Sequence, residues 1–438
     1  MEINSSDEKL IFLICDEVSL ASLLPFIKFF QKKRKKILFL VNSSLDSRIQ
    51  EIKTKSDKIK IVHFEGLNYL IRRSVFLFLR VLFTPIDYSV RYKTWLKNTF
   101  SKLYFITLFF SQINSIFFKL FKLKKECINI NINSIMSFLF QSNYFGLKNP
   151  NNKIVTTSLF NNHCLLANKK LNIFLYVESW DHIYKFPFGF CPKKVFTWNK
   201  SLAKDWHSYQ GGEEIIPSIP IKFNYLSNKK TNKIPNDIFI YPFSSCSKST
   251  NDLYLEELKF VHKLCNFFSK EKNKKLLLKP KPNAEKNEID YFLSYKNVEI
   301  GNYNYNKKNT IYYDISKRYN QKRVSEMKSA KAVINVATTY MFDASSIGLP
   351  IYQLQLNFSN FSRLNNVGTH IKNILNKNNL YIFNLYDFDD IEEHFKAIFN
   401  SKKNYSKAIK FSTNLRNWLY DGKSYNHHIE NFYQEVLN

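Results

Sequence analysis

Short apolar runs alternate with segments of helical periodicity from residue 10 onward. The run LIFLICDEV is typical of a buried strand, SLASLLPFIKFFQKKRK of an amphipathic helix, and KILFLVNSS and IKIVHFE of two further strands. Continuous apolar strands separated by helices indicate a parallel sheet covered on both faces, and such sheets bind ligands at the carboxyl ends of their strands. We therefore predict a βαβ opening with Asp16, Asn42 and Ser43 at its ligand-binding edge.

The same alternation continues to the end of the chain. Further strands are expected at KIVTTS, NIFLYV, KKVFTWN, EEIIPSI, DIFIYPFSS, KKLLLKPKPN, NVEIG, KAVINVATT and PIYQLQL, and helices at 251–270, KRVSEMKSA, 340–347 and from 389 onward. This pattern predicts an α/β fold with two Rossmann-like domains that face a cleft. The expected divisions are an N-terminal domain at 1–221, a polar Asn/Lys-rich linker at 222–236, a C-terminal domain at 237–422, and a helix at 423–438 long enough to return to the N-terminal domain.

Segment 67–125 is unusual because it is basic and aromatic, has no glycine and contains Asp87 as its only acidic residue. We predict extra helices here, inserted in the N-terminal domain. They fit a membrane surface, with basic side chains toward anionic lipid, and equally fit ordinary packing on the sheet. A membrane span at 103–121 is the third alternative, against which Gln112, Asn114 and Lys119 weigh. The candidate membrane or acceptor contacts are Arg72, Arg73, Lys122, Lys124 and Lys125.

Net charge points to phosphate-bearing partners. The 438 residues include 65 Lys and Arg against 36 Asp and Glu, a balance of +29, which favours contact with a nucleotide-linked substrate, an anionic membrane or nucleic acid. An AT-rich genome would produce the same Lys-rich composition without selection for function. Recognised nucleic-acid modules are absent and the basic residues are scattered, so a nucleic-acid partner is not expected.

Several common classes of site are excluded by enumeration. The nine glycines form no GxGxxG, and the Gly-Lys-Ser at Gly422 has Asn417 where a P-loop needs its first glycine. The six cysteines form no CxxC pair, so neither a disulfide scaffold nor a zinc site is supported. The polar, acidic N-terminus MEINSSDEKL is unlike a signal peptide, and we expect a cytoplasmic protein.

Hydroxyl and lysine side chains follow three strands of the C-terminal domain. KAVINVA runs into Thr338 and Thr339 and then directly into a helix, where phosphate fits, although a threonine there can also simply cap the helix. Strand DIFIYPF runs into Ser244 and Ser245. Lys279 and Lys281 end a further strand, which the prolines after them hold extended. Together these residues predict a pocket for a nucleoside diphosphate.

In the N-terminal domain, strand NIFLYV leads into candidate catalytic groups. Glu178 and Asp181 flank Trp180, and His163 follows the preceding strand KIVTTS. A carboxylate or imidazole close to an attacking hydroxyl can act as general base. The alternative is that Trp180 belongs to the core and the acids cap a turn.

The sequence does not predict a metal site. One Asp-x-Asp pair occurs, from Asp387 to Asp389, but Asp389 and Asp390 directly precede the helical segment IEEHFKAIF. Helix capping with acids in the first turn explains these two aspartates. We expect no metal and no cofactor other than the co-substrate.

Four segments, VESWDHI, KKVFTWNKSLAKDWHSYQG, IIPSIP and VINVATTYMFDASSIGLPIYQL, resemble in order and spacing bacterial GT-B glycosyltransferases of surface-polysaccharide and lipopolysaccharide biosynthesis. The resemblance covers about residues 153–430. It implies that Thr338 and Thr339 meet the diphosphate of a nucleotide sugar and that Asp343 meets ribose or sugar hydroxyls. The chain departs from the family at Ser218-Ile219-Pro220, which lacks the family's glycine, at Asp343, where many members have Glu, and at Asn283, where the family has histidine.

The resemblance implies a metal-independent enzyme that transfers a sugar from a nucleotide sugar to a surface-glycan, capsule or lipid-linked acceptor at the inner face of the cytoplasmic membrane. Acceptor specificity is expected within residues 1–150. Two rivals share the architecture, a polyol-phosphate transferase and a nucleotide-sugar 2-epimerase, and fold alone does not separate them. A non-catalytic basic protein that binds nucleic acid or membrane is the third alternative.

Overall fold

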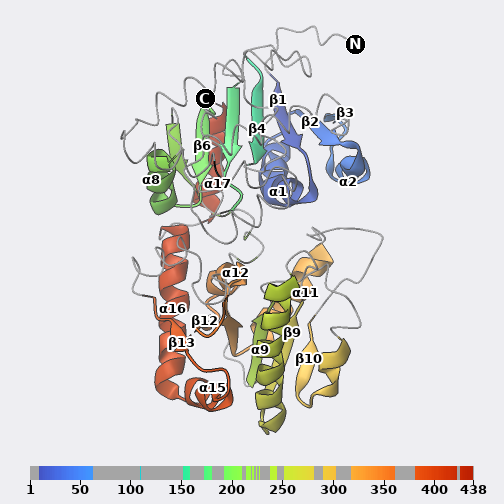
Figure 1. Cartoon of the computed structure of the whole chain (residues 1–438). Coiled ribbons are helices and arrows are strands. Elements are labelled where there is room, and N and C mark those ends of the chain that lie inside the picture. The colour runs from blue at the N-terminus through green and yellow to red at the C-terminus, as the bar shows by residue number, and fades with distance from the viewer. Residues whose placement is uncertain are drawn as a thin grey trace. The chain divides into compact units, whose positions relative to one another are not determined.

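A computed structural model describes residues 9–62, 109, 151–157, 172–179, 192–209, 214–218, 220, 223, 226, 237–243, 251–280, 290–301, 317–360, 380–421 and 425–437. The chain forms two compact units, Met1–Lys222 together with Tyr420–Asn438, and Phe223–Leu419. The predicted basic aromatic helices at 67–125 and nearly all of the predicted linker at 222–236 lie outside the described residues. Figure 1 shows the strands and helices of each unit.

The first unit is built on a seven-stranded parallel sheet with the order β3-β2-β1-β4-β5-β6-β7. Its strands are β1 (Leu10–Ile14), β2 (Ile37–Asn42), β3 (Lys58–Val62), β4 (Lys153–Thr157), β5 (Asn172–Tyr176), β6 (Lys194–Thr197) and β7 (Glu214–Pro217). Its helices are α1 (Glu17–Lys32), η1 (Ser43–Leu45), α2 (Asp46–Ile52), α8 (Lys200–Tyr209) and α17 (Tyr425–Leu437). The strand order reverses between β1 and β4, as in doubly wound sheets.

Helix α1 begins where β1 ends, because Asp16 caps it. The Asp16 carboxylate accepts the backbone N–H of Ser19 at 2.8 Å, which satisfies one of the free donors of the first turn. The apolar face of α1 buries Phe26 and Phe30 completely. One of the side chains predicted at the ligand-binding edge therefore has a structural role.

The C-terminal helix α17 belongs to the first unit and packs against α1 and β6 (Figure 1). The Phe432 ring stacks on Phe26 with 3.6 Å between ring centroids and lies 4.4 Å from the Phe196 ring. Lys194 on β6 pairs with Glu435 at 2.6 Å. Burial alone would lower the pKa of Lys194, but Glu435 and Glu214 raise it above its ordinary value. The last helix of the chain thus covers the sheet formed by the first half.

The second unit repeats this architecture on a six-stranded parallel sheet with the order β10-β9-β8-β11-β12-β13. Its strands are β8 (Asp237–Pro242), β9 (Lys274–Lys279), β10 (Val298–Ile300), β11 (Ala332–Asn335), β12 (Ile351–Leu356) and β13 (Phe383–Leu385). Its helices are α9 (Asn251–Lys270), η5 (Tyr291–Ser294), α11 (Lys317–Ser329), α12 (Tyr340–Ser346), α15 (Ile391–Phe399) and α16 (Lys402–Tyr420). The predicted fold class, two Rossmann-like α/β units, is confirmed by these two strand orders.

Every apolar run predicted as a strand forms one, and among the strands that the structure describes β13 is the one that the sequence missed. Its three residues, Phe383–Leu385, pair with Leu354–Leu356 of β12 at the edge of the sheet. A three-residue strand is too short to show a period.

The capping prediction before α15 was right in position and wrong in mechanism. Asp390 is the N-cap residue, but its side chain makes no capping hydrogen bond, and the Asp387 carboxylate instead accepts the N–H of Asp389 at 2.8 Å.

In the core of the second unit, the hydroxyl of Tyr352 has no hydrogen-bond partner among the described residues. The side chain is fully buried and its ring lies 5.2 Å from the Phe399 ring. Burial raises the pKa of Tyr352 above its ordinary value. By contrast, Tyr241 on β8 donates its hydroxyl to Glu257 at 2.8 Å.

Tyr352→Phe is expected to leave stability unchanged or to raise it by about 1 kcal/mol, because it removes a buried hydroxyl that makes no hydrogen bond. Tyr241→Phe is the matched control. It should lower the free energy of unfolding by about 1–3 kcal/mol, because it leaves the Glu257 carboxylate without that donor. Urea unfolding measures both. A loss of more than 1 kcal/mol in Tyr352→Phe would contradict the environment described for its hydroxyl.

Candidate functional site

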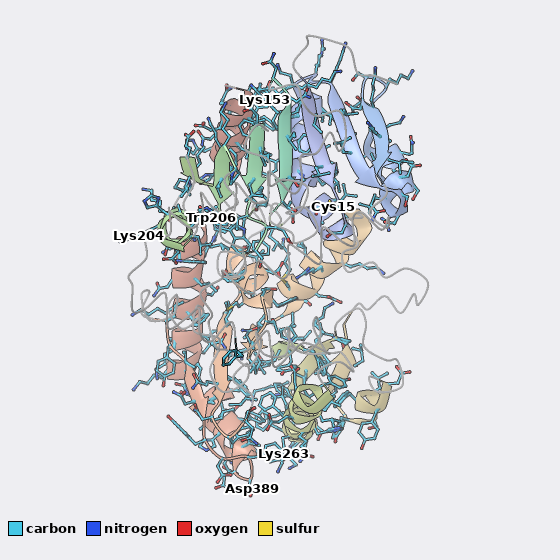
Figure 2. All side chains as sticks on the ribbon, turned by 45° about the horizontal axis from the view of Figure 1, so that its top comes forward. Cys15, Lys153, Lys204, Trp206, Lys263 and Asp389 are labelled. Atoms are coloured by element: carbon cyan, nitrogen blue, oxygen red, sulfur yellow. The ribbon has the colours of Figure 1, made fainter. Side chains whose placement is uncertain are left out.

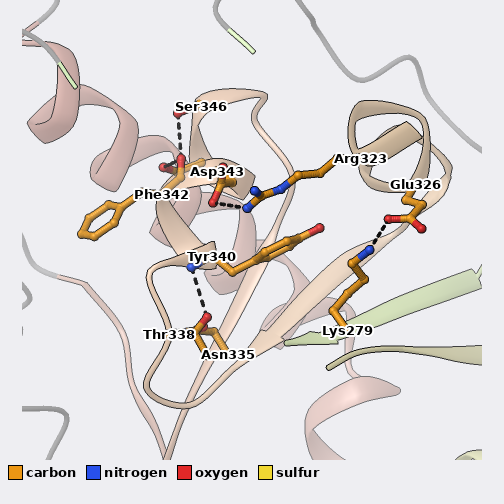
Figure 3. A network of polar contacts seen from close by, with 10 residues as sticks. Lys279, Arg323, Glu326, Asn335, Thr338, Tyr340, Phe342, Asp343 and Ser346 are labelled. Atoms are coloured by element: carbon orange, nitrogen blue, oxygen red, sulfur yellow. Dashed lines mark hydrogen bonds and ion pairs between the residues drawn. The ribbon is translucent and has the colours of Figure 1, made fainter. Parts of the chain in front are cut away.

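Polar side chains of the second unit gather where β9 and β11 end. Lys279 is the last residue of β9, Asn335 is the last residue of β11, and Thr338 and Thr339 follow within four residues. Both strands pair with β8 in parallel, so their carboxyl ends meet at one edge of the sheet. Figure 3 shows Lys279, Asn335 and Thr338 together with Arg323 and Glu326 of α11. This edge is the candidate functional site.

Helix α11 joins the two sides of this site through residues one turn apart. Glu326 receives the Lys279 ammonium, with 2.5 Å between Nζ and Oε2. Arg323 donates from Nη2 to Oδ2 of Asp343 on α12 at 2.7 Å (Figure 3). The Asp343 side chain is 6% exposed and that of Arg323 is 20% exposed. A single helix therefore fixes both the lysine that ends β9 and the acid of α12.

Sequence reasoning missed Arg323, which was assigned only to a helix. The centre of its guanidinium lies 5.2 Å from the Tyr340 ring centroid, a cation–π contact in addition to the ion pair. The signal available in the sequence was a basic and an acidic residue three positions apart, Arg323 and Glu326, on the helix that precedes the strand leading to Thr338. That spacing is common on solvated helices, so it did not single out this residue.

Lys279 is held in a crowded position. Its side chain crosses Gly301, where an added Cβ would lie 2.3 Å from Lys279 Cδ. Burial lowers the pKa of Lys279 below its ordinary value, the Glu326 carboxylate opposes this shift, and the charge of Arg323 adds to it. Two cationic side chains thus share a confined edge of the sheet with the carboxylates of Glu326 and Asp343.

The two threonines have different environments. The Thr338 hydroxyl donates to Oδ1 of Asn335 at 2.9 Å and accepts the N–H of Tyr340 at 3.1 Å. Thr338 is 9% exposed, so its hydroxyl serves to fix the turn before α12. Thr339 is exposed and occupies the N-cap position without a side-chain capping bond. The alternative that a threonine here caps the helix therefore describes Thr338, whose hydroxyl accepts an N–H of the first turn from one residue before the N-cap position.

Asn335 anchors this turn to the neighbouring strand. Its amide donates to Gln353 Oε1 of β12 at 2.7 Å, and Gln353 donates in turn to the carbonyl oxygen of Val336 at 2.6 Å. Both side chains are fully buried. A buried polar network with its partners in place rigidifies the backbone that carries it, so the position of Thr338 and Thr339 is set by side chains inside the sheet.

In the first unit, Glu178 follows β5 as predicted and is 4% exposed. Nearby, the Trp198 indole donates to the carbonyl oxygen of Val177 at 2.8 Å, and Asn199 accepts the N–H of Leu202 at 2.9 Å in the first turn of α8. The remaining predicted site residues lie outside the described residues: His163, Asp181, Ser244, Ser245, Lys281, Arg72, Arg73, Lys122, Lys124 and Lys125.

Two features are absent from the described part of the chain. No group of three or more His, Cys, Asp or Glu side chains there is arranged to hold a metal ion. No helix there combines the length and the apolar character that crossing a membrane requires.

No model of a protein family matches the chain, and no curated protein matches its sequence. Solved structures with a similar arrangement of the chain include the glycotransferase of kitacinnamycin, with 7% identity, 99% of this chain and 100% of that chain covered, and a TM-score of 0.49. The calicheamicin glycosyltransferase has 7% identity, 99% of each chain covered and a TM-score of 0.47. The UDP-GlcNAc 2-epimerase from Methanocaldococcus jannaschii has 10% identity, 93% and 98% covered, and a TM-score of 0.45. These TM-scores lie below 0.5, so none of these likenesses bears on the activity of this chain.

Proposed function

We propose that this chain is a GT-B glycosyltransferase that moves a sugar from a nucleotide-sugar donor to a surface-glycan or lipid-linked acceptor. The observation that carries the proposal is the gathering of Lys279, Thr338, Thr339 and Asp343 at one region of the second sheet, together with Arg323. The sequence resemblance gives donor contacts to Thr338, Thr339 and Asp343, the strand-end pattern predicts Lys279, and Arg323 adds a second cation.

The chemistry of this edge suits a departing diphosphate. Negative charge develops on the leaving nucleotide as the glycosidic bond breaks, and fixed cations and donors stabilise it without reorganisation. Lys279 and Arg323 supply the cations, and the exposed Thr339 supplies a hydroxyl. The ammonium of Lys279 and the guanidinium of Arg323 are both held by carboxylates, which orient them before a donor binds.

For the base that deprotonates the acceptor hydroxyl we propose Asp181. Glu178 is the other carboxylate of this segment, but at 4% exposed it offers an acceptor little access. A base must come within hydrogen-bond reach of the proton it removes. His163 is the remaining candidate. We propose transfer without a metal ion, and contact of the basic residues within 67–125 with an anionic membrane stays a prediction.

Donor trials test the proposal. The purified chain is incubated with UDP-, GDP-, CDP- and CMP-sugars and with CDP-glycerol, and nucleotide release is measured with and without glycan acceptors in the presence of EDTA. We expect acceptor-dependent release from one sugar nucleotide. Release from CDP-glycerol alone would assign a polyol-phosphate transferase, and a change of the sugar without acceptor would assign a 2-epimerase. Salt-sensitive DNA binding with no release from any donor would favour the non-catalytic alternative.

A pair of lysine variants on one strand tests the site. Lys279→Met is expected to lower turnover by about 10²-fold, the usual effect of removing one charge-stabilising group. The matched control is Lys275→Met, at the other end of β9, where the lysine is 54% exposed and pairs with Glu299. Lys279→Met also leaves the Glu326 carboxylate without its cation, which can lower stability. The double variant Lys279→Met/Glu326→Gln removes both charges, so a loss of activity that persists in it is a loss of catalysis and not of stability. Equal activity of the Lys275 and Lys279 variants would contradict the placement of the donor.

A further inference from the structure

A groove in the Phe223–Leu419 unit shares no residue with the cluster at the ends of β9 and β11. It has a volume of about 370 Å³ and is lined by Lys259, His262, Lys263, Asn266, Tyr295, Phe388 and Glu392. This volume falls within the usual range of small-ligand sites. Figure 2 labels Lys263 on α9 and Asp389 before α15 at the same end of this unit, and the Lys263 ammonium lies 5.1 Å from the Phe388 ring centroid.

Two lysines on one wall of the groove, Lys259 and Lys263, form no ion pair among the described residues. The ion pair beside the groove, among the described residues, is that of Lys270 with Glu392 at 2.6 Å, and it uses neither Lys259 nor Lys263. Lys259 is exposed, one turn of α9 before Lys263. Residues four apart on a helix lie on the same face, so the two ammonium groups can act together on one anion.

The carboxylate of the groove is ionised and already held in place. Burial by itself would raise the pKa of Glu392, but hydrogen bonds from Lys270 and Asn266 and the nearby charges of Lys270 and Lys263 lower it below its ordinary value. The Asn266 amide donates to Oε1 of Glu392 at 2.6 Å. Asn266 and Glu392 together present a fixed pair of side chains that can both donate and accept hydrogen bonds.

Aromatic rings form the remaining surface. His262 Nδ1 lies 3.2 Å from the Tyr295 hydroxyl, and its ring centroid is 4.8 Å from that of Phe292. Burial lowers the pKa of His262 below its ordinary value, so at neutral pH the imidazole is neutral and the positive charge comes from the lysines. All seven lining residues are polar or aromatic, and none is aliphatic.

We propose that this groove binds an acidic sugar, that is, a sugar bearing a carboxylate or a phosphate. The anionic group lies between Lys259 and Lys263, the C–H face of the sugar ring lies against Tyr295 and Phe388, and the ring hydroxyls bond to Asn266 and Glu392. A lining of aromatic and planar polar side chains matches a ligand that has an apolar face and a hydroxyl rim. A bare anion would use only the lysines, and an aliphatic ligand would find no aliphatic wall. The proposal does not depend on the proposed function.

Calorimetric titration of the full chain tests this assignment with four probes: a glucuronic-acid oligosaccharide, a glucose oligosaccharide of the same length, glucose 6-phosphate and inorganic phosphate. We expect one or both acidic sugars to bind at least about tenfold more tightly than the neutral oligosaccharide and than phosphate, with the better of them showing whether carboxylate or phosphate is preferred. Binding of both acidic sugars no tighter than that of the neutral sugar or of phosphate would overturn the proposal.

Variants then place the binding in this groove. Lys259→Gln/Lys263→Gln is expected to weaken acidic-sugar binding about tenfold or more, while Lys402→Gln/Lys403→Gln, which removes two exposed charges from α16 of the same unit, leaves it unchanged. Tyr295→Ser should weaken the sugars but not phosphate. Equal affinity of the two double variants would overturn the proposal whether or not donor trials reveal a transferase, because no residue of this groove takes part in the proposed transfer.

Discussion

Phe432→Ala is expected to lower the free energy of unfolding of the first unit by about 3–5 kcal/mol, the usual cost of truncating a buried phenylalanine. Phe432 is fully buried. Its ring contacts Phe26 and Phe30 of α1 and Phe196 of β6. Truncation leaves a cavity at the place where the C-terminal helix meets both a helix and a strand from the first half of the chain.

The matched control on the same helix is Gln434→Ala. Gln434 is exposed and makes a 3.2 Å hydrogen bond to Glu430 within α17, so the change should stay within about 0.5 kcal/mol. Denaturant unfolding gives the loss of stability, and hydrogen exchange localises it, since amides of α17 and β6 should lose protection in Phe432→Ala. A loss below 1 kcal/mol, or unchanged protection over α17, would contradict the packing of this helix on the first sheet.

The second large effect is expected from Asp343→Ala. This change leaves the guanidinium of Arg323 without its carboxylate partner in a mostly buried position. Removing one partner of a fully buried ion pair costs about 3–5 kcal/mol. Because the Arg323 side chain is 20% exposed and water can partly solvate it, we expect about 2–3 kcal/mol in the free energy of unfolding.

A double-mutant cycle shows whether the loss comes from the stranded charge. Arg323→Met/Asp343→Leu removes both charges and should be less destabilised than Asp343→Ala, because apolar replacement of a buried pair is often close to neutral. Glu299→Ala is the control for a surface pair. Its partner Lys275 is 54% exposed, so the loss should stay below about 1 kcal/mol. An Asp343→Ala variant as stable as Glu299→Ala would show that the Arg323 pair contributes no more than a surface ion pair.

Much of the candidate site followed from strand positions alone. Lys279 comes directly after the run LLL, Thr338 and Thr339 come directly after AVINVA, and parallel strands end at a common edge. What each hydroxyl does was not predictable. Thr338 and Thr339 are neighbours of the same residue type, yet the first bonds to Asn335 and the second is exposed. The difference depends on which way the turn before α12 points each side chain.

The sequence by itself predicted every described strand except β13, because an apolar run flanked by polar residues carries its period within a few positions. It also determined the α/β class, since the alternation repeats along the chain. Only the tertiary structure decided that Phe432 packs on Phe26, that Arg323 meets Asp343, and that Lys263 shares a groove with Phe388. Such contacts join elements that no local period relates. They depend on how the helices and loops pack on the sheets, and this packing cannot be read from the period of a single sequence.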